Sequence, residues 1–342
     1  MKSKDGMKVP IARGARTNLA LLALLAIAFL TGWLAFALAT APSRWSLILH
    51  ASSGFAILAL LPWKSMIARR GMRRTGNPSS WPSFVLAALV LISLAAGLMH
   101  STGVATQIGP FSAMTYHVGG AIAAVPFAIW HVFARRVRIR RTDFSRRALL
   151  RGTAVAAVAV AGYAGSEIVV RATGMPGAAR RFTGSYEAGS FDPDALPISS
   201  WMFDAIPEID AASWKLTAPG RTWSYAELAR FDDRLTATLD CTGGFYSTQE
   251  WSGVRLDRLV GNARGSSIRV VSQTGYDRRF PIDEASRLLL ATSIGDRSLD
   301  PGHGYPARLV SADRRGFWWV KWVVAIEVDD LPHWWQSPFP LQ

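Results

Sequence analysis

The chain has little cysteine and, over its first half, almost no acidic residues. One cysteine among 342 residues excludes a disulfide framework. Residues 1–171 contain 20 Lys and Arg against 3 Asp and Glu, whereas residues 172–342 contain 18 against 21. The positive surplus lies in the more apolar half, which argues against a nucleic-acid-binding protein, and we expect no nucleic-acid partner. Only 18% of residues are charged, below the roughly 25% of soluble domains, so we expect part of the chain to lie in membrane lipid.

Long stretches of the first half carry no charge at all, namely residues 17–43, 45–63 and 75–134. Glycine and polar residues divide the last stretch around 103–112, and a weaker apolar run occupies 152–170. Each run offers roughly 20 residues, enough for a helix to cross the ~30 Å hydrocarbon core. The sequence therefore predicts a multi-domain protein whose residues 1–171 form an all-α five-helix transmembrane bundle. The predicted spans are about 18–40, 45–65, 82–101, 113–134 and 152–170.

Basic residues gather in alternate loops of this bundle, and the two intervening loops hold only Arg44. The positive-inside rule places the N-terminus in the cytoplasm and residues 172–342 on the periplasmic side of the cell (inner) membrane. The residues that carry this orientation are Lys2, Lys4, Lys8, Arg13 and Arg16, then Arg69, Arg70, Arg73 and Arg74, and then Arg135, Arg136, Arg138, Arg140, Arg141, Arg146, Arg147 and Arg151.

The fifth span is preceded by the sequence Ser-Arg-Arg-Ala-Leu-Leu at 145–150. This sequence resembles a twin-arginine export signal in an internal position, which would suit a C-terminal domain that is exported in folded form. The alternative is that Arg146 and Arg147 only satisfy the positive-inside rule.

Four of the six histidines, His50, His100, His117 and His131, lie in predicted spans, where polar residues are functional candidates. The second and fourth spans run parallel, and His50 and His117 lie at similar depth near the outer surface. Fourteen residues further in, or ~21 Å along each helix, the residues are Lys64 and His131. This arrangement resembles the membrane-anchored cytochrome b families, in which facing helices hold haem b between paired histidines. The resemblance implies one haem b, ligated by His50 and His117.

Lys64 departs from the two-haem version of that pattern, because it stands where an imidazole partner for His131 would be. His131, and His100 near the outer surface, are therefore only further candidates for haem iron. The alternative is that these histidines form hydrogen bonds inside the bundle or at its interface.

The composition changes after Val170. The segment 172–190 is rich in glycine and small residues and is predicted to be a linker. From 191 to 342, short β-rich runs alternate with turns and a few helices, which predicts an α+β domain. The expected strands lie near 213–217, 235–241, 268–272, 307–311 and 320–328, and the expected helices near 224–232 and 282–290.

The single cysteine, Cys241, ends a predicted strand and is followed by Thr242, Gly243 and Gly244. Glycines permit close approach of the backbone to a bulky ligand, and a thiolate is a soft ligand for a heavy metal. The alternative from the residues alone is a small buried hydrophobic side chain.

Three blocks of sequence resemble the molybdenum-cofactor domain of the sulfite oxidase superfamily. They are Cys-Thr-Gly-Gly-Phe-Tyr-Ser at 241–247 with Trp-Ser-Gly-Val at 251–254, Ser-Gln-Thr-Gly-Tyr at 272–276, and His-Gly-Tyr-Pro-Ala-Arg-Leu-Val at 303–310 with Val-Lys-Trp at 320–322. The resemblance covers most of 190–330 and implies a molybdopterin cofactor whose molybdenum is ligated by Cys241. The other cofactor-binding residues that it implies are Thr242, Gly243, Gly244, Tyr276, His303, Arg308 and Lys321.

Several of these residues have structural alternatives. Arg308 and Lys321 suit a phosphate group, but each also fits the solvated face of a strand. His303 fits a simple turn equally well. The segment 276–279, with Arg278 and Arg279, is expected to be an exposed turn rather than part of the mouth of a substrate site.

The chain departs from the animal and plant sulfite oxidases in two respects. The region around Ser199 lacks their Arg-Asn-His run, and little sequence follows Val328 where those enzymes have an immunoglobulin-like dimerisation domain. Both departures put sulfite in doubt as the substrate.

The two halves together predict a membrane-anchored molybdopterin-dependent oxidoreductase of the sulfite oxidase superfamily. By the resemblance, an oxo-transfer reaction on a small-molecule substrate occurs at molybdenum, and electrons are exchanged through haem b with quinone or another redox protein. The expected surroundings are membrane lipid. The alternative from another class is a non-catalytic membrane-anchored module that uses the molybdopterin-type fold to bind a ligand or partner.

Changing Arg146 and Arg147 to Lys tests the twin-arginine interpretation, because Lys keeps the positive charge of the loop. We expect less of the C-terminal half to reach the periplasm, measured with an export-dependent reporter fused after Gln342. Unchanged export in this variant would leave the positive-inside rule as the only role of the two arginines.

Overall fold

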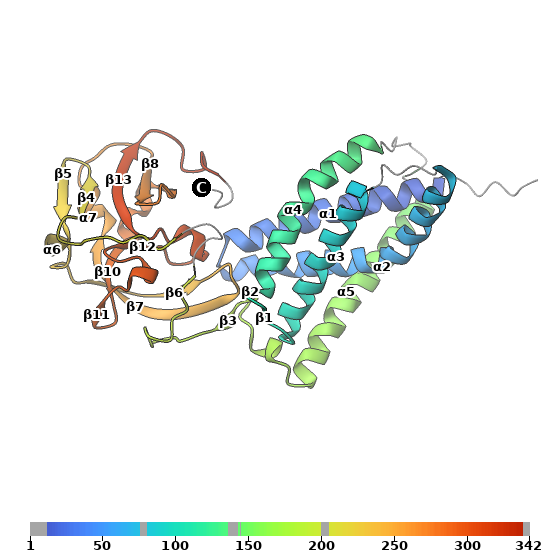
Figure 1. Ribbon diagram of the computed structural model, residues 1–342, viewed down its shortest axis with the longest axis horizontal. Helices are drawn as coiled ribbons and strands as arrows, with labels where there is room; N and C mark the ends of the chain where they lie inside the picture. The colour runs from blue at the N-terminus through green and yellow to red at the C-terminus, as the bar shows by residue number, and fades with distance from the viewer. Residues whose placement is uncertain (1–11, 76–80, 136–142, 144, 200–204, 338–342) are drawn as a thin grey trace, which may run out of the picture. The chain divides into compact units, whose positions relative to one another are not determined.

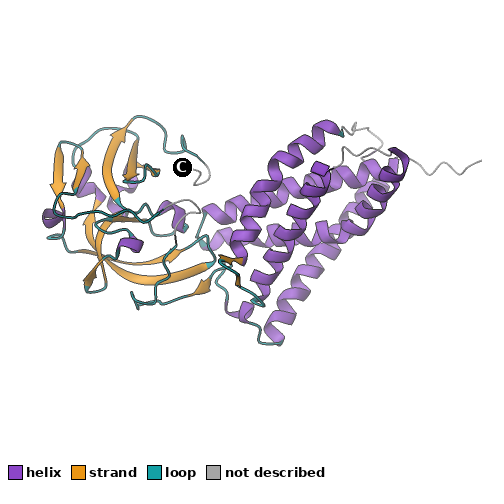
Figure 2. Cartoon of the chain, in the orientation of Figure 1, coloured by secondary structure: helices purple, strands orange, loops and turns teal. Residues whose placement is uncertain are grey.

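The computed structural model describes residues 12–75, 81–135, 143, 145–199 and 205–337. The chain divides into two compact units. The N-terminal unit consists of residues 1–35 and 42–179, and the C-terminal unit of residues 36–41 and 180–342. The first unit is helical and the second is built mainly from strands (Figure 2). The predicted order, apolar helices followed by a mixed sheet domain, is confirmed.

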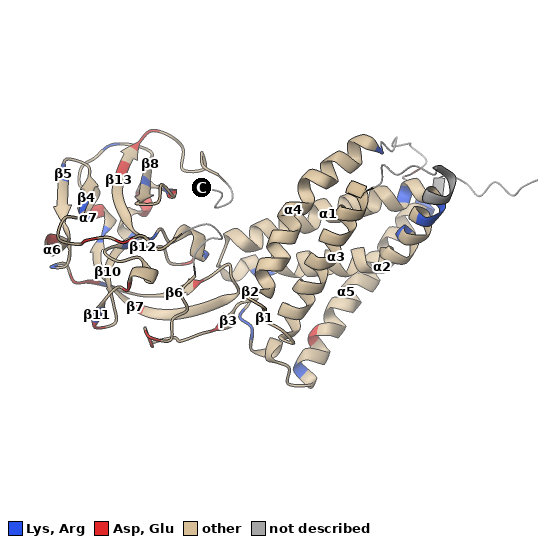
Figure 3. Cartoon of the chain, in the orientation of Figure 1, with Lys and Arg blue, Asp and Glu red and all other residues tan. Residues whose placement is uncertain are grey.

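Five helices of the N-terminal unit are long and apolar enough to cross a membrane. They are α1 (Ala12–Ala37), α2 (Arg44–Thr75), α3 (Trp81–Thr102), α4 (Ala113–Ala134) and α5 (Arg146–Ala172), as Figure 1 shows. Helix α3 packs along α4, and α2 packs along α5. Charged side chains are scarce along these helices (Figure 3). A short hairpin of β1 (Gln107–Ile108) and β2 (Phe111–Ser112) joins α3 to α4.

Part of the predicted orientation rests on loops between these helices. Among the basic residues that carry it, Lys2, Lys4, Lys8, Arg136, Arg138, Arg140 and Arg141 lie outside the described residues. Near the start of α1, Arg16 Nε lies 3.2 Å from Asp143 Oδ1, just before α5. Two of the segments predicted to be cytoplasmic therefore meet at one end of the bundle.

A serine begins α5. Ser145 Oγ accepts a hydrogen bond of 3.3 Å from Ala148 N, which satisfies one of the N–H groups that a helix start leaves unpaired. Arg146 and Arg147 occupy the exposed first turn. The sequence that resembles an export signal is therefore a capped helix start.

Two sheets form the C-terminal unit. One has the order β11-β10-β7-β3, with β12 beside β10 and β6 beside β7, and the other has the order β5-β4-β13-β8-β9. Of the strand pairs within the described residues, β3–β7 and β4–β13 are parallel and the others are antiparallel. The elements are β3 (Tyr186–Glu187), β4 (Lys215–Ala218), β5 (Arg221–Ser224), α6 (Tyr225–Leu228), β6 (Asp233–Asp240), β7 (Phe245–Arg255), α7 (Leu256–Val260), β8 (Ser267–Ser272), β9 (Asp277–Pro281), β10 (Leu289–Ile294), β11 (Arg297–Ser298), β12 (Arg308–Val310) and β13 (Val323–Asp329).

Strand β10 is buried on both faces. Leu290 belongs to one apolar cluster with Leu216 and Phe280, and Leu289 belongs to a second cluster with Trp251. All five side chains are fully buried. The cluster of Leu290 is therefore shared by the two sheets, and the cluster of Leu289 covers the other face of the sheet that contains β10.

The helix predicted near 282–290 is wrong. Ile282–Arg287 form a 3-10 helix, and the strand β10 begins at Leu289. Because β10 is covered on both faces, it begins in a continuous apolar run, 288–291, which hydrophobic periodicity does not distinguish from a buried helix.

The exposed turn predicted around Arg278 and Arg279 is also wrong. Both lie in β9, and their exposed fractions are 0% and 8%. Arg279 Nη1 lies 2.6 Å from Asp329 Oδ1, and Arg278 Nε donates to Tyr276 Oη at 2.7 Å. Charged side chains are buried where such partners replace water.

The segment predicted to be a linker, 172–190, is ordered. It contains a 3-10 helix, Pro176–Ala179, and the strand β3, which pairs in parallel with β7. Thr183 and Ser185 within it are buried. Its glycines and small side chains allow this close packing.

Candidate functional site

Cys241 follows β6 directly and begins the tight turn into β7. Cys241 N donates to Phe245 O at 2.8 Å, and Gly244 N donates to Cys241 O at 3.1 Å. Gly244 has φ +102°, a conformation that side chains with a Cβ rarely adopt. Gly243 N lies 3.3 Å from Cys241 Sγ and donates to it. The turn, with Thr242 half-buried inside it, therefore directs a backbone N–H at the sulfur.

Lys321 is connected to Cys241 by Ser199, which contacts both residues. The Ser199 hydroxyl lies 3.3 Å from Cys241 Sγ, and Lys321 Nζ donates to Ser199 O at 2.7 Å and to Gly302 O at 2.6 Å. Gly304 has φ +106°, and a Cβ added there would lie 3.0 Å from the Cβ of Arg308 and 3.2 Å from that of Lys321. The backbone of this loop thus passes close between the two basic side chains.

Arg308 is a buried cation, and one of its N–H groups has no acceptor among the described residues. Its guanidinium carbon lies 5.0 Å from the ring centroid of Trp251 and 5.6 Å from that of Trp319, and Nη1 donates to His303 O at 3.0 Å. Within the described part of the chain, Nε has no hydrogen-bond partner. Burial lowers the pKa of Arg308 to about 10, and the Cys241 thiolate acts in the opposite direction. Arg308 is therefore not on a solvated strand face.

His303 lies beside these cations and is 4% exposed. Its Nε2 is 3.1 Å from Leu196 O, and its Nδ1 is 3.5 Å from Asp300 Oδ2. Burial, and then the positive charges of Arg308 and Lys321, lower the pKa of His303. We therefore expect a neutral imidazole at neutral pH.

Asp240, next to Cys241, is a fully buried carboxylate that the sequence reasoning missed. The hydroxyls of Thr183 and Ser185 each donate to it at 2.7 Å. Arg181 Nη1 lies 3.3 Å from one carboxylate oxygen, and Arg315 Nη1 lies 3.4 Å from the other. The sequence does contain a signal for this buried charge, because Asp240 ends a predicted strand and lies between two apolar residues, Leu239 and Cys241.

Arg315 connects this carboxylate to the cysteine. Its Nη2 donates to Cys241 O at 3.1 Å, and Nη1 also donates to Thr183 O at 3.3 Å. Burial lowers the pKa of Arg315, while Asp240 and the Cys241 thiolate act in the opposite direction. The ion pair therefore fixes the backbone from which the sulfur projects.

Tyr276 does not join this group. Its hydroxyl donates to Phe317 O and accepts a bond from Arg278 Nε. The structure thus brings together Cys241, Thr242, Gly243, Gly244, His303, Arg308 and Lys321, and it gives Tyr276 other hydrogen-bond partners.

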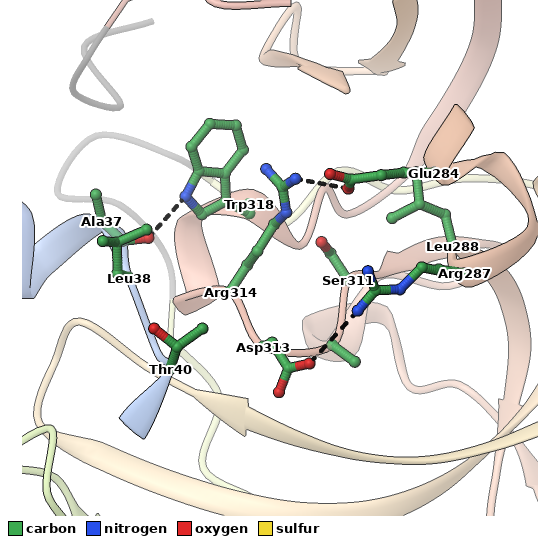
Figure 4. A pocket seen from close by; sticks show the side chains of 11 residues that line it. Ala37, Leu38, Thr40, Glu284, Arg287, Leu288, Ser311, Asp313, Arg314 and Trp318 are labelled. Carbon is green, nitrogen blue, oxygen red and sulfur yellow. Dashed lines mark hydrogen bonds and ion pairs between the residues drawn. The ribbon is translucent and has the colours of Figure 1, made fainter. Parts of the chain in front are cut away.

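A pocket of about 270 Å³ lies elsewhere in the C-terminal unit, beside Trp318 (Figure 4). Two ion pairs border it, Arg314–Glu284 at 2.6 Å and Arg287–Asp313 at 3.8 Å. Its charges are balanced within these pairs. It therefore lacks the positive surplus that surrounds Cys241.

In the N-terminal unit, His50 of α2 and His117 of α4 face each other. Their Nε2 atoms are 3.3 Å apart and their ring planes are 87° apart. His50 Nδ1 lies 2.7 Å from Ala28 O, and His117 Nδ1 lies 2.7 Å from Ser93 O. A carbonyl oxygen only accepts, so we assign the ring proton of each histidine to Nδ1. Each Nε2 then directs a lone pair at the other, an arrangement that suits a cation between them.

The other two candidate histidines lie apart from this pair. His131 Nδ1 is 2.9 Å from Ser83 Oγ, and Lys64 lies close enough to act on it electrostatically. His100 is buried near the end of α3. Among the described residues, no group of three or more His, Cys, Asp or Glu side chains could hold a metal ion.

Asp240→Asn tests how far the site depends on the buried ion pair. Removing one partner of such a pair typically costs about 3–5 kcal/mol, because the other charge stays buried. We expect a loss of this size in the free energy of unfolding, measured by urea denaturation of the detergent-purified chain. The exposed Glu208→Gln is the matched control. A variant within ~0.5 kcal/mol of the wild type would show that Arg315 has no need of Asp240.

Comparisons with known proteins concern mainly the C-terminal unit. No curated protein matches the chain. Among solved structures, the sulfane dehydrogenase SoxCD from Paracoccus pantotrophus is similar, with 24% sequence identity and a TM-score of 0.34. That match covers 37% of this chain and only 40% of the other. Residues 203–335 match the family model of the oxidoreductase molybdopterin binding domain. The residues that match this family model all lie in the C-terminal unit.

Proposed function

We propose that this protein is a membrane-anchored molybdopterin-dependent oxidoreductase of the sulfite oxidase superfamily. Its substrate is a small molecule that gains or loses an oxygen atom, and its electron partner is quinone or another redox protein. The observation that carries the proposal is the group of buried cations beside Cys241, within a domain that matches molybdopterin-binding oxidoreductases.

The residues beside Cys241 fit a molybdopterin. The thiolate of Cys241 would be a soft ligand for molybdenum. Arg308 and Lys321 bring positive charge to the anionic phosphate of the cofactor, and the buried Arg308 Nε has a donor to offer it. Gly243 and Gly244 leave room for a bulky ring system to approach the turn. His303 contributes a neutral ring beside the two cations.

The protein's own part in the chemistry is ligation, orientation and exclusion of water. The N–H of Gly243 stabilises negative charge on the Cys241 sulfur, and Arg315 holds the carbonyl of the same residue. When bound, the cofactor supplies two-electron oxygen-atom transfer, and a haem supplies one-electron exchange. The surrounding side chains are mostly buried, so charges at the site are poorly screened by water.

We propose haem b as the group held by His50 and His117. The two Nε2 atoms are 3.3 Å apart and would together hold the iron. The carbonyl oxygens of Ala28 and Ser93 fix the tautomer that this ligation requires. His100 and His131 remain weaker candidates for iron.

The proposed location is the cell membrane, with five spans and with the C-terminal unit outside the cytoplasm. The length and composition of α1 to α5 support the spans. The distribution of basic residues along the sequence supports the orientation.

Cys241→Ser is expected to abolish turnover with both substrate and artificial dyes, because a hydroxyl is a poor ligand for a soft metal. The loss should exceed the roughly 10- to 100-fold effect of removing a supporting contact. The far-UV circular dichroism and the membrane insertion of the variant should stay unchanged. Turnover within twofold of the wild type would contradict the proposed role of Cys241.

His50→Ala and His117→Ala are each expected to remove the low-spin haem spectrum, because each leaves only one imidazole on the iron. Dyes that reach the C-terminal unit directly should still support turnover. His131→Ala is the matched control and should keep the haem. If His131→Ala loses all haem while His50→Ala keeps it, the proposed ligands are wrong.

A further inference from the structure

Four helices of the N-terminal unit bring polar side chains together at a second level. Lys64 Nζ of α2 donates to Asn18 Oδ1 of α1 at 2.9 Å. Ser83 Oγ of α3 and His131 Nδ1 of α4 are 2.9 Å apart. Lys64 and His131 each follow a residue of the facing histidine pair by 14 positions, or ~21 Å along the helix. This polar cluster, Asn18, Lys64, Ser83 and His131, is therefore separate from the proposed haem site.

The cluster is positively charged. Lys64 and Arg135 both act electrostatically on His131, and Arg135 also acts on Lys64. Within the described ranges, neither Lys64 nor His131 forms an ion pair with a carboxylate. Ionisable residues inside membrane helices are rarely retained without a functional partner.

The ammonium group of Lys64 points to a neighbouring helix and forms a hydrogen bond there. A lysine near a helix end usually extends its ammonium toward the interface, yet this ammonium is bonded to the side chain of a neighbouring helix. An ammonium has three donors, and the bond to Asn18 uses one of them. His131 keeps Nε2 after its contact with Ser83. All four side chains are half-buried, so a molecule dissolved in the lipid can reach them.

We propose that Asn18, Lys64, Ser83 and His131 bind the head group of a membrane quinone. This inference rests on the proposed function, for which quinone is one of two candidate electron partners. A quinone presents two carbonyl oxygens that only accept hydrogen bonds, and the cluster offers donors on facing helices.

The test is the binding of a short-chain benzoquinone or naphthoquinone to the detergent-purified full chain, measured by equilibrium dialysis. We expect Lys64→Met and His131→Leu each to weaken binding at least ~10-fold, as for the loss of one charge-assisted hydrogen bond. Both changes replace a polar group by an apolar one in a membrane helix, so the variants should fold. The matched control is Arg69→Met, which removes an exposed cation from the same helix and should bind within ~twofold of the wild type.

Three results would overturn the proposal. They are no binding by the wild type, binding by Lys64→Met and His131→Leu within ~twofold of it, or equal weakening in Arg69→Met. Loss of phosphatidylglycerol binding in Lys64→Met, with quinone binding intact, would identify a lipid phosphate as the ligand instead. Dialysis requires neither molybdenum nor haem. A chain that binds quinone but lacks dye-linked turnover or a low-spin haem would therefore contradict the proposed function and not this site.

Discussion

A single buried carboxylate organises the candidate site of the C-terminal unit. Asp240 has no exposed surface, so its charge is stable only while Thr183, Ser185, Arg181 and Arg315 surround it. These partners come from the segment before β3 and from the loop after β12. Because Arg315 also holds the carbonyl of Cys241, the position of the sulfur depends on the same ion pair. A segment whose composition suggests a linker is thereby built into the site.

The two kinds of candidate metal ligand, the Cys241 thiolate and the imidazoles of His50 and His117, are oriented by opposite means. A thiolate is an acceptor, and the turn directs the N–H of Gly243 at it. An imidazole ligand must present a lone pair, and the carbonyl oxygens of Ala28 and Ser93 achieve this by accepting a hydrogen bond from the far ring nitrogen, Nδ1. In each case the orienting groups belong to the backbone. The helix or turn already holds them in place, so no side chain has to lose conformational entropy to orient the ligand.

The sequence predicts the features that follow from local composition, such as the apolar helices. It does not predict the features that depend on contacts between distant segments, such as the burial of a charged side chain. Long uncharged runs are sufficient to find α1 to α5, and equal depth in parallel spans is sufficient to suggest that His50 and His117 meet. The burial of Arg278 could not be predicted, because the carbonyl of Ser337 that it binds and the rings of Phe317 and Trp318 beside it belong to other segments. The burial of Asp240 could not be predicted for the same reason. A carboxylate is expected at the surface unless the residues that pair with it are known.

Helices α2 and α4 carry both levels of polar residues in the N-terminal unit, and one substitution makes the levels different. At the first level two imidazoles face each other with lone pairs that can be shared by a metal. At the second level Lys64 stands in the sequence where a second imidazole would be, and its ammonium has no lone pair and repels a cation. A second centre of the first kind is therefore disfavoured there. The same positive charge attracts electron-rich oxygen atoms, so the residue that breaks the repeat of histidines also determines which class of ligand the inner level suits.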